Sequence, residues 1–311
     1  MQKVVISGGT GLIGSALTKE LLAKGYQVVI LTRKENVKSD QAALSFSYWN
    51  IEQGIVDEDL IAEADYIVHL AGAGVAEKRW TKARKTEIVD SRVKSASLLC
   101  QVLHKNRLRL NLKSFISASA IGWYGADAHN PNPKPFTETA PKSDDYLGTT
   151  CFQWEQSVQP IVDLGKRLVI LRTGIVLSNE GGALSAFEKP LQYGFAAILG
   201  SGRQMVSWIH IEDLLRLYIT AMTSNTWQGI YNAVAPAPVN NKTLTLEIAK
   251  RVKGRYFTTL HVPEFVLKVV LGEMSIEVLK SATVSSGKIH DMGFVFQYPT
   301  VSAALSQLLK K

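Results

Sequence analysis

The sequence has few cysteines, no long apolar run and no clustered histidines. Its 311 residues include only Cys100 and Cys151, at a spacing that fits neither a metal site nor a redox motif, so we expect no disulfide framework. No apolar run reaches the roughly 18 residues that a membrane-spanning helix needs. The six histidines are scattered, and no ligand spacing predicts a metal site. Because no apolar leader precedes the first strand, we expect a cytoplasmic protein without a membrane partner.

Positive charge exceeds negative charge, but it is not gathered into a recognisable binding module. Lysine and arginine number 35 against 27 acidic residues, which gives a formal net charge of +8. Much of the excess lies at residues 78–94 and 105–113, and the first stretch also holds Glu87 and Asp90, as on a solvated helix. Neither stretch belongs to a known nucleic-acid fold. We therefore expect no nucleic-acid partner, and a basic surface that favours an anionic small molecule.

Short apolar segments alternate with helical ones over the first half of the chain. Runs rich in β-branched residues, typical of buried strands, lie at residues 3–7, 27–31, 65–70, 114–118 and 167–171. Helical patterns lie at residues 15–24, which Gly25 ends, and at residues 82–104. Buried strands separated by helices predict an α/β fold with a Rossmann-like, doubly wound parallel sheet.

A glycine-rich turn follows the first strand. Residues 7–14 read SGGTGLIG, which matches both G-x-G-x-x-G and the wider G-x-x-G-x-x-G spacing. Glycine is needed because the chain turns tightly, its backbone approaches a pyrophosphate, and the next helix packs close to the sheet. The helix start directs open N–H groups at the phosphates. The pattern predicts a dinucleotide site with contacts from Gly8, Thr10, Gly11, Leu12, Ile13 and Gly14.

The end of the second strand predicts which dinucleotide binds. An acidic residue about 20 residues beyond the glycines would bind the ribose 2′-hydroxyl, but the sequence here reads Leu31-Thr32-Arg33-Lys34. The planar guanidinium of Arg33 can pair with a 2′-phosphate, and Lys34 adds charge. We therefore expect NADP(H) as the cofactor, with Thr32 and Arg33 in contact with it. An exposed basic loop is the alternative.

The pattern of strands and helices changes after about residue 174. Residues 129–142 are predicted to form a loop because they hold Pro131, Pro133, Pro135 and Pro141. Helical patterns return at residues 264–271 and 276–281. We expect an NADP-binding Rossmann domain over residues 1–173, completed by 206–233. Residues 174–205 and 234–311 would form a smaller, mainly helical substrate region.

Longer motifs run through the rest of the chain. They include residues 70–74 (LAGAG), 79–81 (RWT), 90–93 (DSRV), 119–125 (SAIGWYG), 171–174 (LRTG), 200–213 (GSGRQMVSWIHIED) and 293–296 (GFVF). With these motifs, the chain resembles the extended, epimerase-like branch of the short-chain dehydrogenase/reductase superfamily. It is most similar to the members that carry a C-terminal domain of unknown function, and the likeness runs nearly end to end.

The resemblance implies further cofactor contacts. It places Leu70, Ala71 and Gly72, at the end of the fourth strand, against the ribose and the pyrophosphate. It also implies that three side chains approach the cofactor, namely Glu87, Arg92 and Glu155. A guanidinium on a helix that faces the cleft can donate hydrogen bonds to ribose or phosphate oxygens. For Glu87 and Arg92, a surface ion pair is the alternative.

The catalytic motif of the superfamily is altered in this chain. Active members use a serine or threonine, a tyrosine, and a lysine four residues later that lowers the pKa of the tyrosine. Aligned on Glu155, the tyrosine position holds Leu147 and the lysine position holds Cys151, while Arg92 replaces the usual asparagine. We nominate two neighbouring hydroxyls as catalytic candidates, Ser119 and Tyr146.

The remaining motif residues suggest a substrate site but no particular substrate. Trp80, Gln204, Trp208 and His210 are candidates for its lining, with a structural histidine as the alternative for His210. An NADP(H)-dependent oxidoreductase or epimerase acting on a small carbonyl or sugar-like substrate is the leading hypothesis. A weakly active or inactive NADP(H)-binding sensor is the rival, because the tyrosine and lysine are missing. A homodimer is possible for either.

Overall fold

A computed structural model describes residues 1–130 and 132–310, so Pro131 of the predicted loop lies outside the described residues. Its main sheet has seven parallel strands in the order β12-β6-β5-β4-β1-β2-β3. Their bounds are β1 (Lys3–Ser7), β2 (Gln27–Thr32), β3 (Leu44–Tyr48), β4 (Tyr66–His69), β5 (Ser114–Ala120), β6 (Arg167–Thr173) and β12 (Gly229–Ala233). Strand order reverses between β1 and β4, which opens a crevice at the carboxyl ends of the strands. The predicted doubly wound parallel sheet is confirmed.

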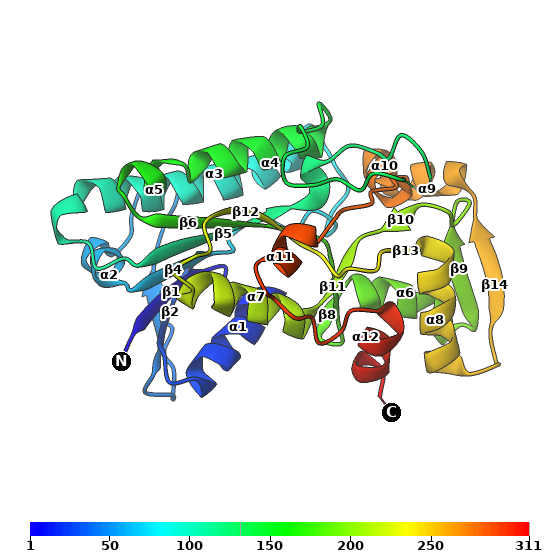
Figure 1. Cartoon of the computed structure of the whole chain (residues 1–311), viewed down its shortest axis with the longest axis horizontal. Helices are drawn as coiled ribbons and strands as arrows, with labels where there is room; N and C mark the ends of the chain where they lie inside the picture. Colours follow the sequence, from blue (N-terminus) through cyan, green and yellow to red (C-terminus); the bar gives the residue numbers. More distant parts are fainter. Residues whose placement is uncertain (131, 311) are drawn as a thin grey trace.

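Helices cover both faces of this sheet (Figure 1). On one face lie α3 (Lys82–Lys105), α4 (Tyr146–Ser157) and α5 (Pro160–Asp163), beside the short α2 (Glu58–Glu63); on the other lie α1 (Leu12–Ala23) and α7 (Ile211–Thr223). The sheet has a hydrophobic core on each face, and successive residues of β1 contribute to opposite ones. Val4 and Ile6 pack toward α1 and α7, while Val5 packs toward α3. Burial on both faces explains why the strands read as continuous apolar runs.

Several boundaries differ from the sequence-based expectation. The first helix begins at Leu12 rather than at residue 15, directly after the glycine turn. The edge strand β3 was not predicted, because its sequence LSFSY alternates apolar and polar residues and is only partly buried. Such a strand gives a weaker signal than a central one, which is apolar throughout. Residues 132–142 contain neither helix nor named strand, as expected for the described part of the loop.

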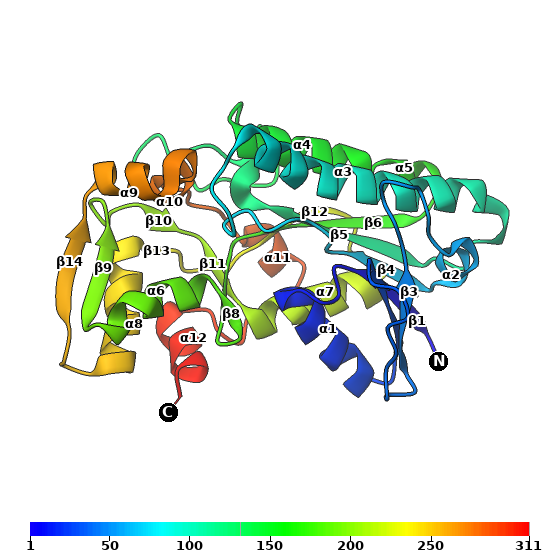
Figure 2. The ribbon, with the colours of Figure 1, turned by 180° about the vertical axis from the view of Figure 1, so that it is seen from behind.

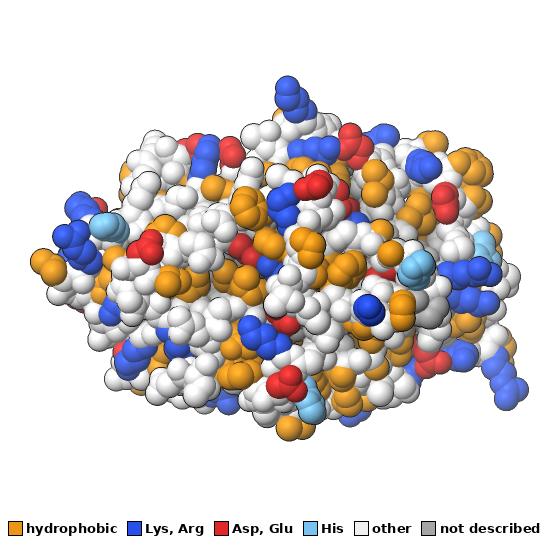
Figure 3. All heavy atoms as spheres, turned by 45° about the horizontal axis from the view of Figure 1, so that its top comes forward, with side chains coloured by type: hydrophobic (Ala, Val, Ile, Leu, Met, Phe, Trp, Pro, Cys, Tyr) orange, Lys and Arg blue, Asp and Glu red, His pale blue; other side chains and the backbone are white. Residues whose placement is uncertain are grey.

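The second region is mainly helical and carries only small sheets (Figure 2). Its helices are α6 (Ala183–Gln192), α8 (Asn241–Lys253), α9 (Glu264–Leu271), α10 (Ser275–Leu279), α11 (Gly287–Asp291) and α12 (Val301–Leu308). Its strands are β7 (Ile175–Ser178), β8 (Gly181–Gly182), β9 (Phe195–Leu199), β10 (Met205–Val206), β11 (Trp208–His210), β13 (Val239–Asn240) and β14 (Thr258–Val262). The helix predicted over residues 264–271 is confirmed as α9, and the next one ends earlier than expected, at Leu279. Apolar side chains gather on the surface near α9 and α10 (Figure 3).

A buried carboxylate on α7 holds the last part of the chain. Asp213 is fully buried and accepts hydrogen bonds from the backbone N–H groups of Gln297 and Tyr298, each at 2.9 Å. The Tyr298 hydroxyl donates to Glu212 at 2.8 Å. The ring of His210 stacks on that of Tyr298 with 3.8 Å between centroids. The motif WIHIED therefore anchors the C-terminal segment to the main sheet.

This anchoring encloses two of the residues predicted to contact a substrate. Trp208 and His210 are both fully buried. The indole N–H of Trp208 donates to the carbonyl of Ala237 at 2.9 Å, and Nε2 of His210 lies 3.0 Å from the side-chain oxygen of Gln307. Both side chains are thus enclosed by protein, the arrangement that the structural alternative for His210 describes.

Candidate active site

The turn between β1 and α1 is shaped by glycine. Gly8 has φ of +72°, and a Cβ added there would lie 2.7 Å from the carbonyl carbon of Leu70. A Cβ at Gly14 would lie 2.6 Å from the Cα of Gly9. Only glycine therefore lets the turn, the first helix and the end of β4 approach so closely.

The first turn of α1 leaves its positive end open. Gly11 is the N-cap residue; within the described chain no side chain caps the helix, and its first turn contains no acid. The unpaired N–H groups and the helix dipole favour an anion at this end. The neighbouring Thr10 is exposed, while Leu12 and Ile13 are half-buried. This cradle fits a pyrophosphate, as the glycine spacing predicts.

A buried histidine ties the two strands at the crevice together. Nδ1 of His69, at the end of β4, lies 2.6 Å from the hydroxyl of Ser7 at the end of β1. Nε2 of His69 lies 3.3 Å from the hydroxyl of Ser95 on α3. The Ser7 hydroxyl also accepts from the N–H of Ala71 at 3.4 Å. Burial lowers the pKa of His69 to about 4, so this neutral imidazole braces the backbone under Leu70 and Gly72.

Sequence reasoning missed His69. A polar residue that ends an otherwise apolar strand was the available signal, because a buried polar group needs hydrogen-bond partners.

The end of β2 presents the predicted 2′-phosphate residues to solvent. Arg33 and Lys34 are exposed, and Thr32 is half-buried with its hydroxyl accepting from the N–H of Lys34 at 3.2 Å. Since β2 is the neighbour of β1, Arg33 lies one strand away from the glycine turn. An exposed guanidinium at this place is suited to pair with a phosphate.

Glu87 and Trp80 belong to the loop that follows β4 and to the start of α3. Arg84 donates to Glu87 at 2.7 Å and to the carbonyl of Gly74 at 2.5 Å. The pKa of Glu87 is lowered chiefly by Arg84, and further by Lys78 and Arg33. The ion pair expected as the alternative for Glu87 is therefore present.

Trp80 is also held within the protein. Its indole N–H donates to the carbonyl of Val75 at 2.9 Å, and its ring meets the edge of Tyr146 at 5.0 Å between centroids. The side chain is 9% exposed. Trp80 thus fixes the loop against α4, which leaves little of its surface for a substrate.

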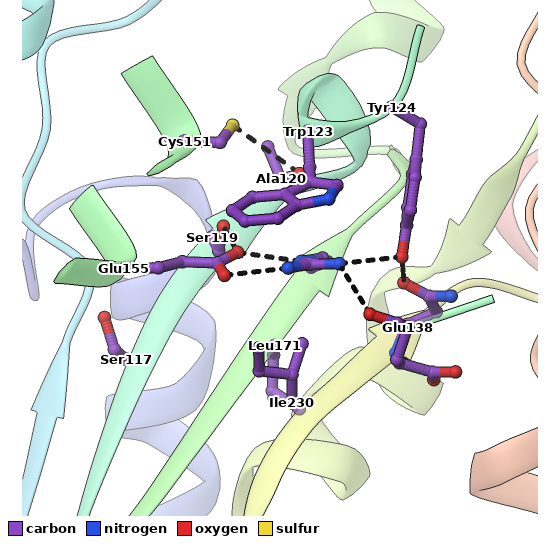
Figure 4. Close-up of polar contacts among 12 residues, drawn as sticks. Ser117, Ser119, Ala120, Trp123, Tyr124, Glu138, Cys151, Glu155, Leu171 and Ile230 are labelled. Carbon is purple, nitrogen blue, oxygen red and sulfur yellow. Dashed lines mark hydrogen bonds and ion pairs between the residues drawn. The ribbon is translucent and has the colours of Figure 1, made fainter. Parts of the chain in front are cut away.

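A buried ion pair joins Arg172, near the end of β6, to Glu155 on α4. Glu155 lies beside Ser119 of β5 (Figure 4). Arg172 and Glu155 form two parallel hydrogen bonds, from Nε at 2.8 Å and from Nη2 at 2.9 Å. The hydroxyl of Ser119 donates to the same carboxylate at 2.7 Å. Trp123 covers the guanidinium, whose carbon lies 3.7 Å from the ring centroid. Glu155 is 3% exposed, so its carboxylate faces protein donors rather than an open cofactor cleft, contrary to the implication of the resemblance.

The same network fixes the tyrosine of the SAIGWYG motif. Arg172 donates to the Tyr124 hydroxyl at 3.1 Å, and that hydroxyl donates to the side-chain oxygen of Asn232 at 2.7 Å. Arg172 and Tyr124 belong to the motifs LRTG and SAIGWYG, but no role was predicted for either side chain. A charged residue at the end of the apolar strand RLVILRT was the available signal, because such a charge requires a partner.

The positions of the altered catalytic motif lie beside this network. Cys151 donates to the carbonyl of Ala120 at 3.6 Å, and burial raises the pKa of its thiol to about 12. A Cβ at Gly122 would lie 3.2 Å from Leu147. The hydroxyl of Tyr146 donates to the carbonyl of Lys85 on α3 at 2.9 Å. Both nominated hydroxyls, on Ser119 and Tyr146, thus donate to acceptors inside the protein.

The other predicted contacts divide between the two regions. Gln204 is 5% exposed and donates to the carbonyl of Leu199 at 3.0 Å, so it holds a turn of the second region. Arg92 is nine-tenths buried beside Gly72.

Over the described residues, no group of His, Cys, Asp or Glu side chains is arranged to hold a metal ion. Among the helices described, none combines the length and the apolar character needed to span a bilayer.

A parallel sheet with a glycine turn at its switch point and an open helix N-terminus defines a Rossmann-type dinucleotide-binding protein. The NAD dependent epimerase/dehydratase family matches residues 4–233, and a domain of unknown function matches residues 262–308. The chain belongs to the NAD dependent epimerase/dehydratase family, and it carries this C-terminal domain, as the sequence motifs predict.

Several relatives share the whole architecture. An epimerase family protein of Staphylococcus aureus (strain NCTC 8325) is 34% identical over 311 residues, which cover both chains completely. The crystal structure of a human epimerase family protein with NADPH aligns with a TM-score of 0.84 at 26% identity, over 99% of each chain. A nucleoside-diphosphate sugar epimerase from Corynebacterium glutamicum aligns with a TM-score of 0.77 at 30% identity, over 99% of this chain and 58% of that one.

Proposed function

We propose that the chain is an NADP(H)-dependent oxidoreductase or epimerase that acts on a small carbonyl or sugar-like substrate. The observation that carries the proposal is the uncapped N-terminus of α1, with Gly11 at its cap and exposed Arg33 one strand away. The human relative was crystallised with NADPH, which supports the choice of cofactor. When bound, the dinucleotide would supply the hydride chemistry.

The residues of this chain would bind and orient the cofactor. Backbone N–H groups from the glycine turn would hold the pyrophosphate, with Gly8 and Gly14 allowing its close approach. Arg33 would pair with the 2′-phosphate, and the backbone of residues 70–72 would border the ribose. His69 would keep that backbone in place through Ser7 and Ser95. A cytoplasmic location and a homodimer stay predictions.

A second candidate function is a sensor that binds NADP(H) without efficient turnover. Leu147 and Cys151 stand where the superfamily has its tyrosine and lysine, and the thiol of Cys151 is protonated at neutral pH because burial raises its pKa to about 12. Ser119 and Tyr146 each donate their only hydroxyl proton to a protein acceptor. No described group at this place is therefore ready to donate a proton to a substrate.

A fluorescence titration tests the cofactor assignment. Wild-type protein is expected to bind NADPH at least about tenfold more tightly than NADH, the size of one charge-assisted hydrogen bond. Arg33→Ala should remove this preference by weakening NADPH alone. Lys24→Ala, which removes an exposed charge at the far end of α1, is the matched control and should keep it. Equal affinities for both dinucleotides in the wild type would exclude the 2′-phosphate assignment.

A turnover assay separates the enzyme from the sensor. NADPH oxidation is followed with a panel of aldehydes, ketones and nucleotide sugars, and active substrates are repeated with Ser119→Ala and Tyr146→Phe. A substrate-dependent rate supports the enzyme. Micromolar NADPH binding without turnover on any member of the panel would favour the sensor.

A further inference from the structure

The outer edge of one small sheet in the second region is open. β14 pairs with β9 in parallel over all five of its residues, and the two strands are the whole of this sheet. β14 lies at the margin of the molecule in both ribbon views (Figures 1 and 2). Four of its five residues are exposed, whereas only one residue of β3, at an edge of the main sheet, is exposed. Another strand can therefore reach the edge of β14.

The backbone of β14 has unused hydrogen-bonding groups along this edge. The N–H of Thr258 and the carbonyl of Val262 are bonded to residues that flank β9. Since successive residues of a strand direct these groups to opposite edges, Thr259 and His261 direct theirs outward. Proteins usually protect such an edge with lysine, proline or a bulge. The sequence of β14 is TTLHV, and its pairing with β9 has no bulge, so this protection is missing here.

The edge is complementary to itself in the antiparallel direction. When Leu260 lies opposite the partner's Leu260, Thr259 lies opposite the partner's His261. The outward N–H and C=O groups of these two residues then form a hydrogen-bonded pair. Thr258 lies opposite the partner's Val262, so β-branched side chains pair on the same face as the two leucines. A two-fold axis at Leu260 therefore satisfies the open edges of both copies at once.

The charges at the two ends of β14 fit the same arrangement. Arg255 precedes the strand and Glu264 follows it, and both are exposed. Within residues 1–130 and 132–310, neither side chain takes part in an ion pair. An antiparallel pair brings Arg255 of each copy to the end that holds the partner's Glu264. The two-fold axis therefore gives two pairs of opposite charge, one at each end of the interface.

Aromatic surface lies beside these charges. Tyr256 is 87% exposed and Phe265 is 69% exposed. Together they leave roughly 300 Å² of aromatic side chain in water on each copy. A standard interface buries about 800 Å² of each partner, so these two rings supply a substantial part of that area, and the exposed strand between them adds to it.

We propose that two copies of this chain associate through the edge of β14, with antiparallel pairing about a two-fold axis at Leu260. The strands β9 and β14 of both copies would form one four-stranded sheet across the interface. Two ion pairs between Arg255 and the partner's Glu264 would fix its register. A second copy is the occupant because the strand and its flanking charges complement themselves. The inference does not depend on the cofactor, since no residue assigned to the dinucleotide belongs to β14 or to α9.

Sedimentation equilibrium of the full chain tests the surface. Over roughly 1–100 μM, wild-type protein should show a monomer–dimer equilibrium. Thr259→Pro removes an outward N–H and leaves the bonds to β9 in place, so it should weaken dimerisation by at least about tenfold. Ile276→Ser is the matched control, because it removes a side chain of α10 that is 62% exposed and lies outside the proposed interface. It should leave the dimerisation constant unchanged.

A charge exchange tests the register. Arg255→Glu and Glu264→Arg each place like charges at both ends of the interface, and each should weaken the dimer by at least about tenfold. The double variant carries opposite charges again and should recover the wild-type dimerisation constant. A role of either residue within its own chain alone would not give this recovery.

Wild-type protein that stays monomeric over the whole concentration range would overturn the inference. Binding of that monomer to vesicles of phosphatidylcholine and phosphatidylserine would instead assign its exposed apolar side chains to a membrane surface. A dimer that persists in Thr259→Pro and in both single charge variants would overturn the inference as well, because it would use another surface. Should Thr259→Pro not fold, as judged by circular dichroism, the loss and recovery in the charge variants decide.

Discussion

The two ends of the candidate site are built in different ways. At the nucleotide end, glycines and an uncapped helix leave the backbone open to an anion. At the chemistry end, below β5 and β6, charged and hydroxyl side chains have already paired with one another, with Arg172 bound to Glu155 at the centre. An open backbone is suited to bind a ligand, whereas a satisfied polar network is suited to hold a structure. The end proposed to receive the cofactor is thus open, whereas the polar groups at the other end are already paired within the protein.

The largest effect is expected where the chemistry end loses its ion pair. Glu155→Ala leaves Arg172 charged and buried, which should lower the free energy of unfolding by about 3–5 kcal/mol. Urea unfolding followed by circular dichroism measures the change. The double variant Glu155→Leu with Arg172→Met removes both charges and should recover much of the loss. Little destabilisation by Glu155→Ala would show that the network does not hold the structure.

A pH effect of nearly the same size should come from the nucleotide end. The pKa of His69 is lowered from 6.5 to about 4. Between pH 6.5 and about pH 4, the unfolded chain therefore binds a proton at His69 that the folded chain does not bind. The stability contribution of His69 is therefore complete above pH 6.5 and is lost as the pH falls toward 4, by about 3 kcal/mol in total. Urea unfolding at several pH values measures it. His69→Gln cannot titrate, and a slope as steep as that of the wild type would contradict this assignment.

A smaller effect, on binding, should separate glycines by their place. Gly8→Ala puts a Cβ against the backbone of Leu70 at the cofactor cradle, and should weaken NADPH binding by at least about tenfold. Gly25→Ala is the matched control, because Gly25 also has a positive φ, of +80°, but a Cβ there meets nothing within 4 Å. The positive φ strains both variants by about 1 kcal/mol, and only Gly8→Ala adds a close contact with the backbone. The comparison fails if Gly25→Ala weakens NADPH binding as much.

The smallest effect is expected at Tyr146. Tyr146→Phe removes the hydrogen bond to the Lys85 carbonyl but keeps the ring against Trp80, so stability should fall by about 0.5–1.5 kcal/mol. NADPH affinity should stay unchanged. Thermal unfolding and fluorescence titration measure the two quantities. A large loss of NADPH affinity would place the phenol at the cofactor and bring the chemistry end closer to that of the superfamily.

The difference between the two ends also explains what could be predicted from the sequence. The glycine turn is local, so the spacing of Gly8, Gly11 and Gly14 after an apolar strand predicted its conformation. The parallel sheet followed from strands that are buried on both faces. The Arg172 network was missed because its members come from β5, α4, β6 and β12, and the sequence contains no local sign of which acid pairs with which base.

The positions of motif residues in the fold could not be predicted for a related reason. Trp208 and His210 stand in a specific block and so were assigned to a substrate, but the partners that bury them, such as Tyr298, lie in the last part of the chain. A motif indicates that its residues are needed without indicating whether a ligand or the protein itself needs them.

The carboxylate of Asp213 makes two distant parts of the chain depend on each other. It accepts hydrogen bonds from Arg216 on its own helix, α7, and from the backbone N–H groups of Gln297 and Tyr298. If residues 297–298 detach, this buried carboxylate loses two of its donors on a helix that covers the main sheet, and such a loss is costly. The C-terminal segment and the nucleotide-binding half should therefore unfold together as one cooperative unit.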